Sequence, residues 1–545
     1  MVEQTGGEAV VALLSEFGVR HVFGIVSVHN LPIFDALGRS SRIELVPVRH
    51  EQGGVHAADG YARATGSMGV VVTSTGPGAA NGMGGLFEAA YASSPVLMIT
   101  GQVETAYLGQ GRGYIHNADR QAEMLGTLVR KVATVERRQD LIELFADVVT
   151  EMMRGRRMPG AIEIPIDLQS QRYDDPPISL VSPPKARPES AAVSRAAELL
   201  RGGRTPLIWA GGGVAAADAT VELRRLAERI GAPVLTSIEG RGAIPEDHQL
   251  SLGPNSDMTV VDPLIAGADV VLAVGTRFQM STPMARALTI PGQLIHLDVD
   301  PTVIGLVHQA AVALVGDAKL GLQDLLDRVD AGSADATLAA RAVAVRAAAD
   351  AETSDAIGPD FTRLIDIIRS GLPRGAVVVK DTTIAATIWA NRSLPVYEPR
   401  TSIRAASMAI GPGVPLALGA AIGSGSPTVV IQGDGGLMLS VGELATLVQQ
   451  RVPVVVCVFN DGGYGILRHI QTVGFEGRHT GVDLVTPDFV CLAKSIGLDA
   501  ISVRGVDEFG KAFNEAVVSG RPYLLDIDMS ALAPLEIRAQ RPTAR

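Results

Sequence analysis

Two aspartates in glycine-rich loops near the end of the chain could together hold a divalent cation. Asp434 lies in the segment Gly433–Gly436, and Asp461 is followed by two glycines. Each loop follows an apolar run of strand length, 427–432 for the first and 452–459 for the second. The carboxyl ends of parallel strands meet at one edge of a sheet, where ligands bind. Oxygen ligands there suit Mg²⁺, which usually shares its shell with phosphates, so the spacing predicts a metal site that bridges to a diphosphate.

The alternative for these loops is an ordinary turn and two unrelated loop residues. The second loop at this spacing argues against that interpretation. Between the two runs, Ser440 and Glu443 have the spacing of a capping box, which predicts a helix that ends near Gln450. We therefore expect strand, loop, helix and strand in this order.

A third and a fourth segment could also carry chemistry. Ile43 to Val48 is predicted as a strand and 52–65 as a small-residue helix, with Glu51 between them. A lone glutamate at a helix start is more often a surface residue that complements the helix dipole. The segment 408–415 contains glycine and proline before an apolar stretch, which predicts a turn followed by a helix at 416–423.

Together these motifs resemble those of the large thiamine diphosphate-dependent family that contains acetolactate synthases, 2-oxo acid decarboxylases and benzaldehyde lyase. The resemblance covers essentially the whole chain. It implies that the Mg²⁺ ligands are Asp434, Asp461 and the backbone carbonyl of Gly463. Asp461 stands where many members have asparagine. Because this adds a carboxylate beside an anionic diphosphate, we expect the metal affinity to be more sensitive to low pH.

The resemblance also assigns roles toward the thiamine diphosphate. Glu51 matches the glutamate that drives the aminopyrimidine into its imino tautomer, a task that requires a mostly apolar pocket. Ile410 matches the wedge that bends the cofactor, and the carbonyl of Met408 matches the acceptor for the pyrimidine amine. The other residues expected to bind the cofactor are Gly76, Pro77, Asn81, Gly433, Gly435, Gly436, Tyr464, Gly465 and Ile466.

Two histidines are further catalytic candidates. His29 stands where benzaldehyde lyase keeps its catalytic histidine, and a neutral imidazole there could relay a substrate proton. The alternative is a histidine at a helix start that is satisfied by backbone. His116 is a second candidate, for which a structural role is favoured. Arg468 and His469 either face a substrate carboxylate or lie on the surface, and the adjacent histidine pair of pyruvate decarboxylases is absent from the sequence.

The overall pattern is closest to acetolactate synthases, because the segments 73–81, 295–301 and 460–465 resemble theirs. It implies decarboxylation of a 2-oxo acid with carboligation to a second carbonyl compound. Against this, the expected glutamine is replaced around His116, and the region after Tyr464 lacks a tryptophan. The alternatives are a non-ligating decarboxylase of the benzoylformate type or a hydroxyketone lyase that uses His29. A catalytically silent thiamine-binding partner protein is a more remote alternative, because both Glu51 and Asp434 are present.

The elements that must position these residues predict an α/β protein of three doubly wound, mostly parallel-sheet domains. Proline-rich and alanine-rich stretches mark the connections. The predicted ranges are a pyrimidine-binding domain 1–170, a Pro-rich linker 171–189, a Rossmann-like middle domain 190–331, a helical connector 332–357, a diphosphate- and metal-binding domain 358–530 and a tail 531–545.

The middle domain contains the glycine triplet 211–213 after an apolar run, but the full fingerprint of a nicotinamide dinucleotide site is absent. The resemblance implies FAD here in acetolactate synthases and no cofactor in many decarboxylases. The segment Gly275–Phe278 resembles the flavin-contacting segment. The acidic residues that commonly follow it are replaced by Gln279 and Met280.

Composition excludes several other classes. With 545 residues the chain is too long for one core, and its net charge of −11 argues against nucleic acid as a partner. No apolar run approaches the length of a membrane span, and the N-terminus does not have the pattern of a signal peptide. The two cysteines are expected to be buried. We expect a cytoplasmic enzyme for a 2-oxo acid or hydroxyketone. The resemblance implies a homodimer or homotetramer with its active site at the subunit interface.

Overall fold

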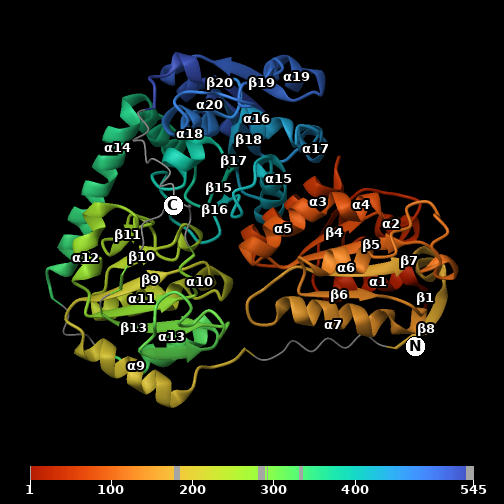
Figure 1. The fold of residues 1–545 in the computed structure, drawn as a ribbon, viewed down its shortest axis with the longest axis horizontal. Helices are drawn as coiled ribbons and strands as arrows, with labels where there is room; N and C mark the ends of the chain where they lie inside the picture. The colour runs from red at the N-terminus through yellow and green to blue at the C-terminus, as the bar shows by residue number, and fades with distance from the viewer. Residues whose placement is uncertain (1, 177–184, 280–288, 291, 331–334, 536–545) are drawn as a thin grey trace.

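Three six-stranded parallel sheets, each flanked by helices, form the protein (Figure 1). The computed structural model describes residues 2–176, 185–279, 289–290, 292–330 and 335–535. This arrangement confirms the predicted fold class. A short antiparallel pair, β1 (Val2–Thr5) with β8 (Arg172–Asp175), ties the two ends of the first domain together.

The first domain contains β2 (His21–Gly24), β3 (Glu44–Pro47), β4 (Gly69–Thr73), β5 (Val96–Gln102), β6 (Lys131–Thr134) and β7 (Gly160–Pro165), with helices α1 (Gly6–Glu16), α2 (Leu31–Gly38), α3 (Glu51–Thr65), α4 (Pro77–Asn81), α5 (Met83–Ala92), α6 (Gln121–Gly126), α7 (Leu141–Met153) and α8 (Ile166–Ser170). The middle domain contains β9 (Pro206–Ala210), β10 (Val234–Thr236), β11 (Ser251–Gly253), β12 (Val270–Val274), β13 (Gln293–Asp298) and β14 (Val312–Val315), with α9 (Ser190–Gly202), α10 (Gly213–Ala216), α11 (Thr220–Ile230), α12 (Asp262–Ala266) and α13 (Ala318–Leu326). The last domain contains β15 (Val377–Lys380), β16 (Ser402–Arg404), β17 (Thr428–Gly433), β18 (Val454–Asn460), β19 (Asp499–Val503) and β20 (Tyr523–Asp528), with α14 (Leu338–Gly371), α15 (Gly413–Ser424), α16 (Asp434–Met438), α17 (Glu443–Gln450), α18 (Gly465–Gly474), α19 (Phe489–Ser495) and α20 (Val506–Ser519).

The first and last sheets share one strand order, which differs from that of the middle sheet. They run β3-β2-β4-β5-β7-β6 and β16-β15-β17-β18-β20-β19, so in both the first strand lies between the second and the third. The order reverses between β2 and β4 in one sheet and between β15 and β17 in the other. Ligands bind beyond the carboxyl ends of strands at such switch points. The loops that carry His29, Gly76 and Asp434 follow these strands directly.

A shared hydrophobic core joins the first and last domains through α3 and α15, which lie side by side in Figure 1. The two helix backbones touch at glycines. A Cβ atom on Gly419 would lie 1.7 Å from the carbonyl oxygen of Ala57, and one on Gly60 would lie 2.0 Å from that of Leu416. The small residues of both helices therefore serve close packing, which fixes the two domains of one chain relative to each other.

Several local predictions were wrong. The capping box at Ser440 does not form, because Glu443 instead accepts hydrogen bonds from the first domain. Cys491 is exposed, and only Cys457 of the two cysteines is buried. By contrast, the predicted helical connector is helical from Leu338 onward, where it forms the first part of α14, and α14 kinks at Gly358 where φ is 80°. Residues 332–334 of this connector lie outside the described residues. The limits between domains stay a prediction, and residues 177–184 of the linker and 536–545 of the tail lie outside the described residues.

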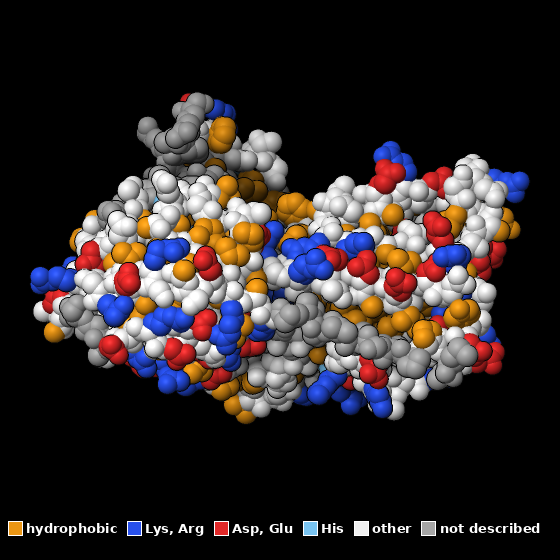
Figure 2. Space-filling view, turned by 90° about the horizontal axis from the view of Figure 1, so that it is seen from below, with side chains coloured by type: hydrophobic (Ala, Val, Ile, Leu, Met, Phe, Trp, Pro, Cys, Tyr) orange, Lys and Arg blue, Asp and Glu red, His pale blue; other side chains and the backbone are white. Residues whose placement is uncertain are grey.

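Acidic and basic side chains are interspersed over the face drawn in Figure 2, with apolar side chains between them. This face presents no broad field of one charge sign. Among the described residues, no helix combines the length and the apolar character needed to cross a bilayer.

Candidate functional site

Asp434 and Asp461 lie together at the carboxyl edge of the last sheet. They follow the neighbouring strands β17 and β18, and the backbone N–H of Asp461 donates to Oδ1 of Asp434 at 3.4 Å. Asp434 is 1% exposed, and its Oδ2 has no hydrogen-bond partner. Burial raises the pKa of Asp434. Burial, and then the Asp434 carboxylate, raise the pKa of Asp461 to about 6. Two carboxylates in a poorly solvated place, one with an unsatisfied oxygen, fit a divalent cation.

The carbonyl of Gly463 reaches the same place. A Cβ atom on Gly435 would lie 3.1 Å from that carbonyl oxygen and 2.7 Å from the ring of Tyr464, so the loop closes over a glycine. The structure therefore brings together the three predicted ligands. In the described part of the chain, no group of three or more His, Cys, Asp or Glu side chains could hold a metal. A site built from two carboxylates and one carbonyl leaves the remaining positions to phosphate and water oxygens.

Arg468, on α18, fastens the loop that carries Asp461. Its guanidinium donates to the carbonyl oxygens of Asp461 and Gly462, both at 3.3 Å, and to Asp483 at 2.8 Å. One of its nitrogens lies 3.8 Å from the Asp461 carboxylate. These contacts give Arg468 a third role, on the metal loop, beside the two roles that the sequence left open.

The segment of Met408 and Ile410 is bent sharply over the same sheet. Met408 has a φ of 64°, which is rare for a residue other than glycine, and Gly411 has a φ of 98°. Asp381 holds the turn by accepting from the backbone N–H of Gly411 at 2.9 Å and of Gly413 at 3.4 Å. Burial raises the pKa of Asp381 to about 6.

Sequence reasoning missed Asp381, although a signal was present. It follows the apolar strand β15 just as Asp434 follows β17, so the same rule of strand and acidic residue could have found it. Gln432, the second-to-last residue of β17, also donates a side-chain hydrogen bond to Asp381. Nothing in the local pattern of Gln432 indicates this role.

In the first domain, Glu51 is the first residue of α3 and lies beside the loop after β4. Its carboxylate accepts from the side chain of Asn81 at 3.1 Å, and a Cβ atom on Gly78 would lie 3.0 Å from it. Glu51 and Asn81, each predicted to bind the cofactor, thus contact each other, and Gly76 and Pro77 begin the neighbouring helix α4. Glu51 is only half-buried. The single chain does not build the apolar pocket that we expected around it.

His29 and His116 form a pair that the sequence did not indicate. Their ring centroids are 5.3 Å apart. His29 is 4% exposed, and its Nδ1 has no hydrogen-bond partner. Burial, and then the proximity of His116, lower the pKa of His29, which favours a neutral imidazole. His116 is exposed on a left-handed turn with a φ of 62°. The carbonyl oxygen of His116 lies 2.5 Å from where a Cβ atom of Gly76 would be. The loop of His116 therefore lies beside the start of α4, which is next to Glu51.

Gln121 is a further buried residue that sequence reasoning missed. Its side-chain oxygen accepts from the backbone N–H of Gly76 at 2.6 Å and from Thr75 at 3.1 Å. Its amide donates to Glu163 at 2.7 Å. It therefore fixes the loop after β4.

Within one chain, the residues around Glu51 and His29 stay separate from the residues around Asp434 and Asp461. Glu443, 1% exposed, bridges the domains by accepting from the backbone N–H groups of Arg49 and His50 at 3.0 and 3.1 Å. No hydrogen bond or ion pair of the described residues joins Glu51 to Asp434 or Asp461. Exposed apolar side chains border both groups. They are Val26, Val28 and Leu31 beside His29, and Met408, Met438 and Leu439 beside Asp434.

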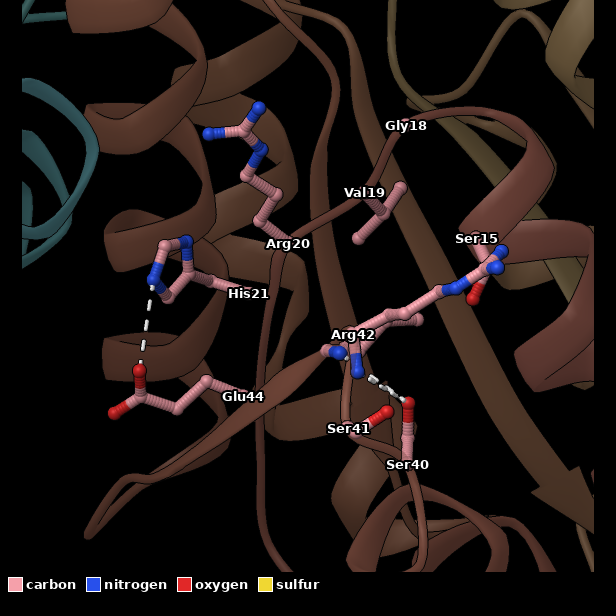
Figure 3. A pocket seen from close by; sticks show the side chains of 10 residues that line it. Ser15, Gly18, Val19, Arg20, His21, Ser40, Ser41, Arg42 and Glu44 are labelled. Carbon is pink, nitrogen blue, oxygen red and sulfur yellow. Dashed lines mark hydrogen bonds and ion pairs between the residues drawn. The ribbon is translucent and has the colours of Figure 1, made fainter.

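An open hollow of about 650 Å³ lies elsewhere on the first domain (Figure 3). His21 and Glu44, which line it, are the first residues of β2 and β3. The distance from Nε2 of His21 to Oε2 of Glu44 is 3.8 Å. The hollow is therefore at the amino edge of the sheet, opposite the loops of His29 and Gly76. It contains none of the predicted site residues.

At the carboxyl edge of the middle sheet, the two segments considered for a dinucleotide or FAD, 211–213 and 275–278, lie in contact with each other. Cβ atoms on Gly211 and Gly213 would lie 2.1 and 2.6 Å from Gly275, so these glycines are needed for contact between two loops. The nearby cation Arg156 pairs with Asp300 at 3.4 Å. Met280, which replaces one of the acidic residues that commonly follow the flavin-contacting segment, lies outside the described residues.

Comparisons with known proteins match all three domains. The models described as "Thiamine pyrophosphate enzyme, N-terminal TPP binding domain", "central domain" and "C-terminal TPP binding domain" match residues 4–124, 193–325 and 385–527. A probable acetolactate synthase large subunit of Methanocaldococcus jannaschii is 32% identical, over 96% of this chain and 91% of that protein. The acetolactate synthase large subunit of Corynebacterium glutamicum is 31% identical over 96% and 86%. A probable 2-ketoarginine decarboxylase of Pseudomonas aeruginosa is 34% identical over 92% and 90%.

Proposed function

Because the chain belongs to the family of thiamine pyrophosphate-dependent enzymes, we propose that it decarboxylates a 2-oxo acid and joins the remaining acyl unit to a second carbonyl compound. This is the reaction class of the acetolactate synthases that it resembles. Bound thiamine diphosphate supplies a carbon nucleophile and an electron sink for such chemistry. The observation that carries the proposal is the unsatisfied Oδ2 of the buried Asp434 beside Asp461. Two such carboxylates suit a divalent cation.

Asp434, Asp461 and the Gly463 carbonyl would hold Mg²⁺, and this ion would help to hold the diphosphate at the edge of the last sheet. Their charges favour this, because two carboxylates at this edge repel each other until a cation lies between them. The glycines at 433, 435 and 436, and residues 464–466 at the start of α18, would approach the phosphates with backbone. Ile410 and the Met408 carbonyl would contact the pyrimidine and its amine.

Glu51 would share a proton with the pyrimidine ring and thereby set the tautomer from which the reactive carbon is deprotonated. Asn81 would orient the Glu51 carboxylate, which it already contacts. A shared proton requires a poorly solvated carboxyl group. Because Glu51 is only half-buried in one chain, we expect a second chain to cover it and exclude water from it.

We propose a homodimer as the smallest active unit, with a homotetramer as the expected assembly. Each of the two groups of residues is bordered by exposed apolar side chains, for example Val28 at 63% and Leu439 at 60%. A second copy that covers these side chains would bring Glu51 of one chain over Asp434 of the other.

A second candidate reaction is supported by the histidine pair. His29 is buried, has an unpartnered Nδ1 and faces His116, so it could accept or donate a proton at a substrate hydroxyl. Such a group suits a hydroxyketone lyase or a non-ligating decarboxylase, and one relative is named a decarboxylase. FAD stays a prediction of the resemblance to acetolactate synthases, and no step of either reaction is assigned to it.

The test is analysis of the products formed by purified protein with thiamine diphosphate and Mg²⁺. Pyruvate, benzoylformate, 2-ketoarginine and a hydroxyketone are offered separately, and CO₂, free aldehyde and ligated product are measured. Acetolactate from pyruvate supports the synthase proposal. Free aldehyde with CO₂, or cleavage of the hydroxyketone, replaces it with the second candidate. No turnover of any substrate, by protein that binds the cofactor, would indicate a silent binding protein, and Asp434→Asn is the matched inactive control.

A further inference from the structure

The backbone at Met408 is strained and must be held in place by its surroundings. Its φ of 64° lies in the left-handed region, and its side chain is 37% exposed, so its own packing does not hold it there. Strained residues persist when neighbouring structure over-determines them, and they gather at ligand sites. The residues just before Met408 should therefore be fixed by strong contacts.

Those contacts come from Glu88, on α5 of the first domain. This carboxylate is completely buried. It accepts from the backbone N–H groups of Ala406 at 2.6 Å and Ser407 at 3.0 Å, and also from the Ser407 hydroxyl. The Ser407 hydroxyl oxygen in turn accepts from the N–H of Ala409 at 3.3 Å. One carboxylate thus controls the backbone on both sides of Met408.

Arg63 and Glu239 complete the network. Arg63, on α3, pairs with Glu88 at 3.3 Å and donates to the carbonyl oxygen of Arg404 at 2.8 Å. It also contacts Glu239 of the middle domain at 3.1 Å, and Glu239 accepts from the Arg404 side chain at 2.6 Å. Residues from all three domains therefore converge on 404–407. Buried charges of this kind need all their partners, so the network has one well-defined geometry.

We propose that Glu88 is a positioning residue for the cofactor. By holding the N–H groups of Ala406 and Ser407, it aims the Met408 carbonyl at the amine of the pyrimidine ring. This inference rests on the proposed function, which assigns that carbonyl to the cofactor. It adds that a residue of the first domain sets a cofactor contact made by the last domain.

The test compares two ligands, thiamine diphosphate and its analogue that lacks the pyrimidine amino group. Affinities are measured by calorimetry at saturating Mg²⁺. Wild-type protein should bind the analogue at least about tenfold more weakly, because the Met408 carbonyl loses its donor. Glu88→Gln places an amide N–H₂ among N–H donors. It should weaken thiamine diphosphate binding about tenfold and change analogue binding little, so its preference between the two ligands disappears.

Two further variants keep the test decisive. Ser407→Ala removes only one hydroxyl and should reduce the preference in the same direction, with a smaller effect in the Glu88→Gln background. Asp175→Asn is the matched control, because Asp175 is 2% exposed and pairs with the buried Arg138 far from this segment. It should lower the melting temperature without changing the preference.

The outcomes distinguish an error in the role assigned to Met408 from an error in the role proposed for Glu88. If wild-type protein binds both ligands equally, the assignment of Met408 in the proposed function is wrong. If wild-type protein prefers thiamine diphosphate and folded Glu88→Gln and Ser407→Ala keep that preference, Glu88 has a structural role alone and the inference is overturned.

Discussion

At the scale of single residues, the chemistry depends on carboxylates whose surroundings differ. Asp434 is buried with one oxygen unsatisfied, Asp381 is buried with its oxygens engaged by backbone N–H groups, and Glu51 is half-buried with one amide partner. The first surroundings suit a cation and the second suit a structural role. The third leaves a proton acceptor accessible to a ligand.

Replacing Glu51 by glutamine should abolish most turnover. The amide keeps the size and the contact with Asn81 but cannot hold the transferable proton. We expect the rate constant kcat to fall at least about 100-fold, the lower range for loss of a general acid or base. Steady-state kinetics at saturating thiamine diphosphate measure this, and Gln52→Ala, at the exposed neighbouring position, is the control. Undiminished turnover by the Glu51→Gln protein would show that the assigned role is wrong.

Asp461 should make Mg²⁺ binding depend on pH. Its pKa is raised to about 6, so below pH 6 a proton must leave before the metal binds. Apparent Mg²⁺ affinity should therefore decrease as the pH falls through 6, by up to about tenfold per pH unit. Calorimetric titrations with Mg²⁺ between pH 5 and 8 measure it. Asp461→Asn should flatten the profile, leaving the weaker contribution of Asp434. An Mg²⁺ requirement that stays constant over this range contradicts the prediction.

At the scale of elements, the sequence indicated the strand ends well and the side-chain partners poorly. The apolar runs before Asp434 and Asp461 became β17 and β18, because an apolar run that ends in glycine and aspartate is a local signal. The helix after Ser440 also formed, but Glu443 contacts Arg49 and His50, which lie almost 400 positions away. Glu88 was missed for the same reason: its partners at 406 and 407 are brought to it by tertiary structure. No periodicity in the sequence encodes such a pair.

The contact between α3 and α15 should tolerate no added methyl group. A Cβ atom on Gly419 would meet the Ala57 carbonyl oxygen at 1.7 Å, and both partners are helix backbone that cannot move independently. We expect Gly419→Ala to lower the free energy of unfolding by about 1–3 kcal/mol or more. Urea denaturation measures this. Gly510→Ala in α20, where the Cβ atom meets Ile367 at an ordinary 3.4 Å, is the control. It should be neutral or stabilising by up to about 1 kcal/mol, as expected for alanine inside a helix.

At the scale of the whole molecule, one chain contains all the site residues in two separate groups. The shared core of α3 and α15 fixes the two domains within the chain. The Glu51 group and the Asp434 group nevertheless remain without a direct bond in the described residues, and each is bordered by exposed apolar side chains. A second copy related by a twofold axis would complete two equal sites, because each chain offers both groups.

Mixing two inactive variants should therefore restore activity. In a dimer of Glu51→Gln with Asp434→Asn chains, one site receives both substitutions and the other receives neither. Random exchange makes about half of the dimers mixed, so refolding an equal mixture should recover about a quarter of wild-type activity. Each variant refolded alone should stay inactive. Mixing Glu51→Gln with His29→Ala, whose substitutions lie in the same group, should restore little beyond the activity of His29→Ala itself, because every site of a mixed dimer then carries one substitution. If the first mixture stays as inactive as its components, although native mass spectrometry shows mixed dimers, each site is built within one chain and the proposed assembly is wrong.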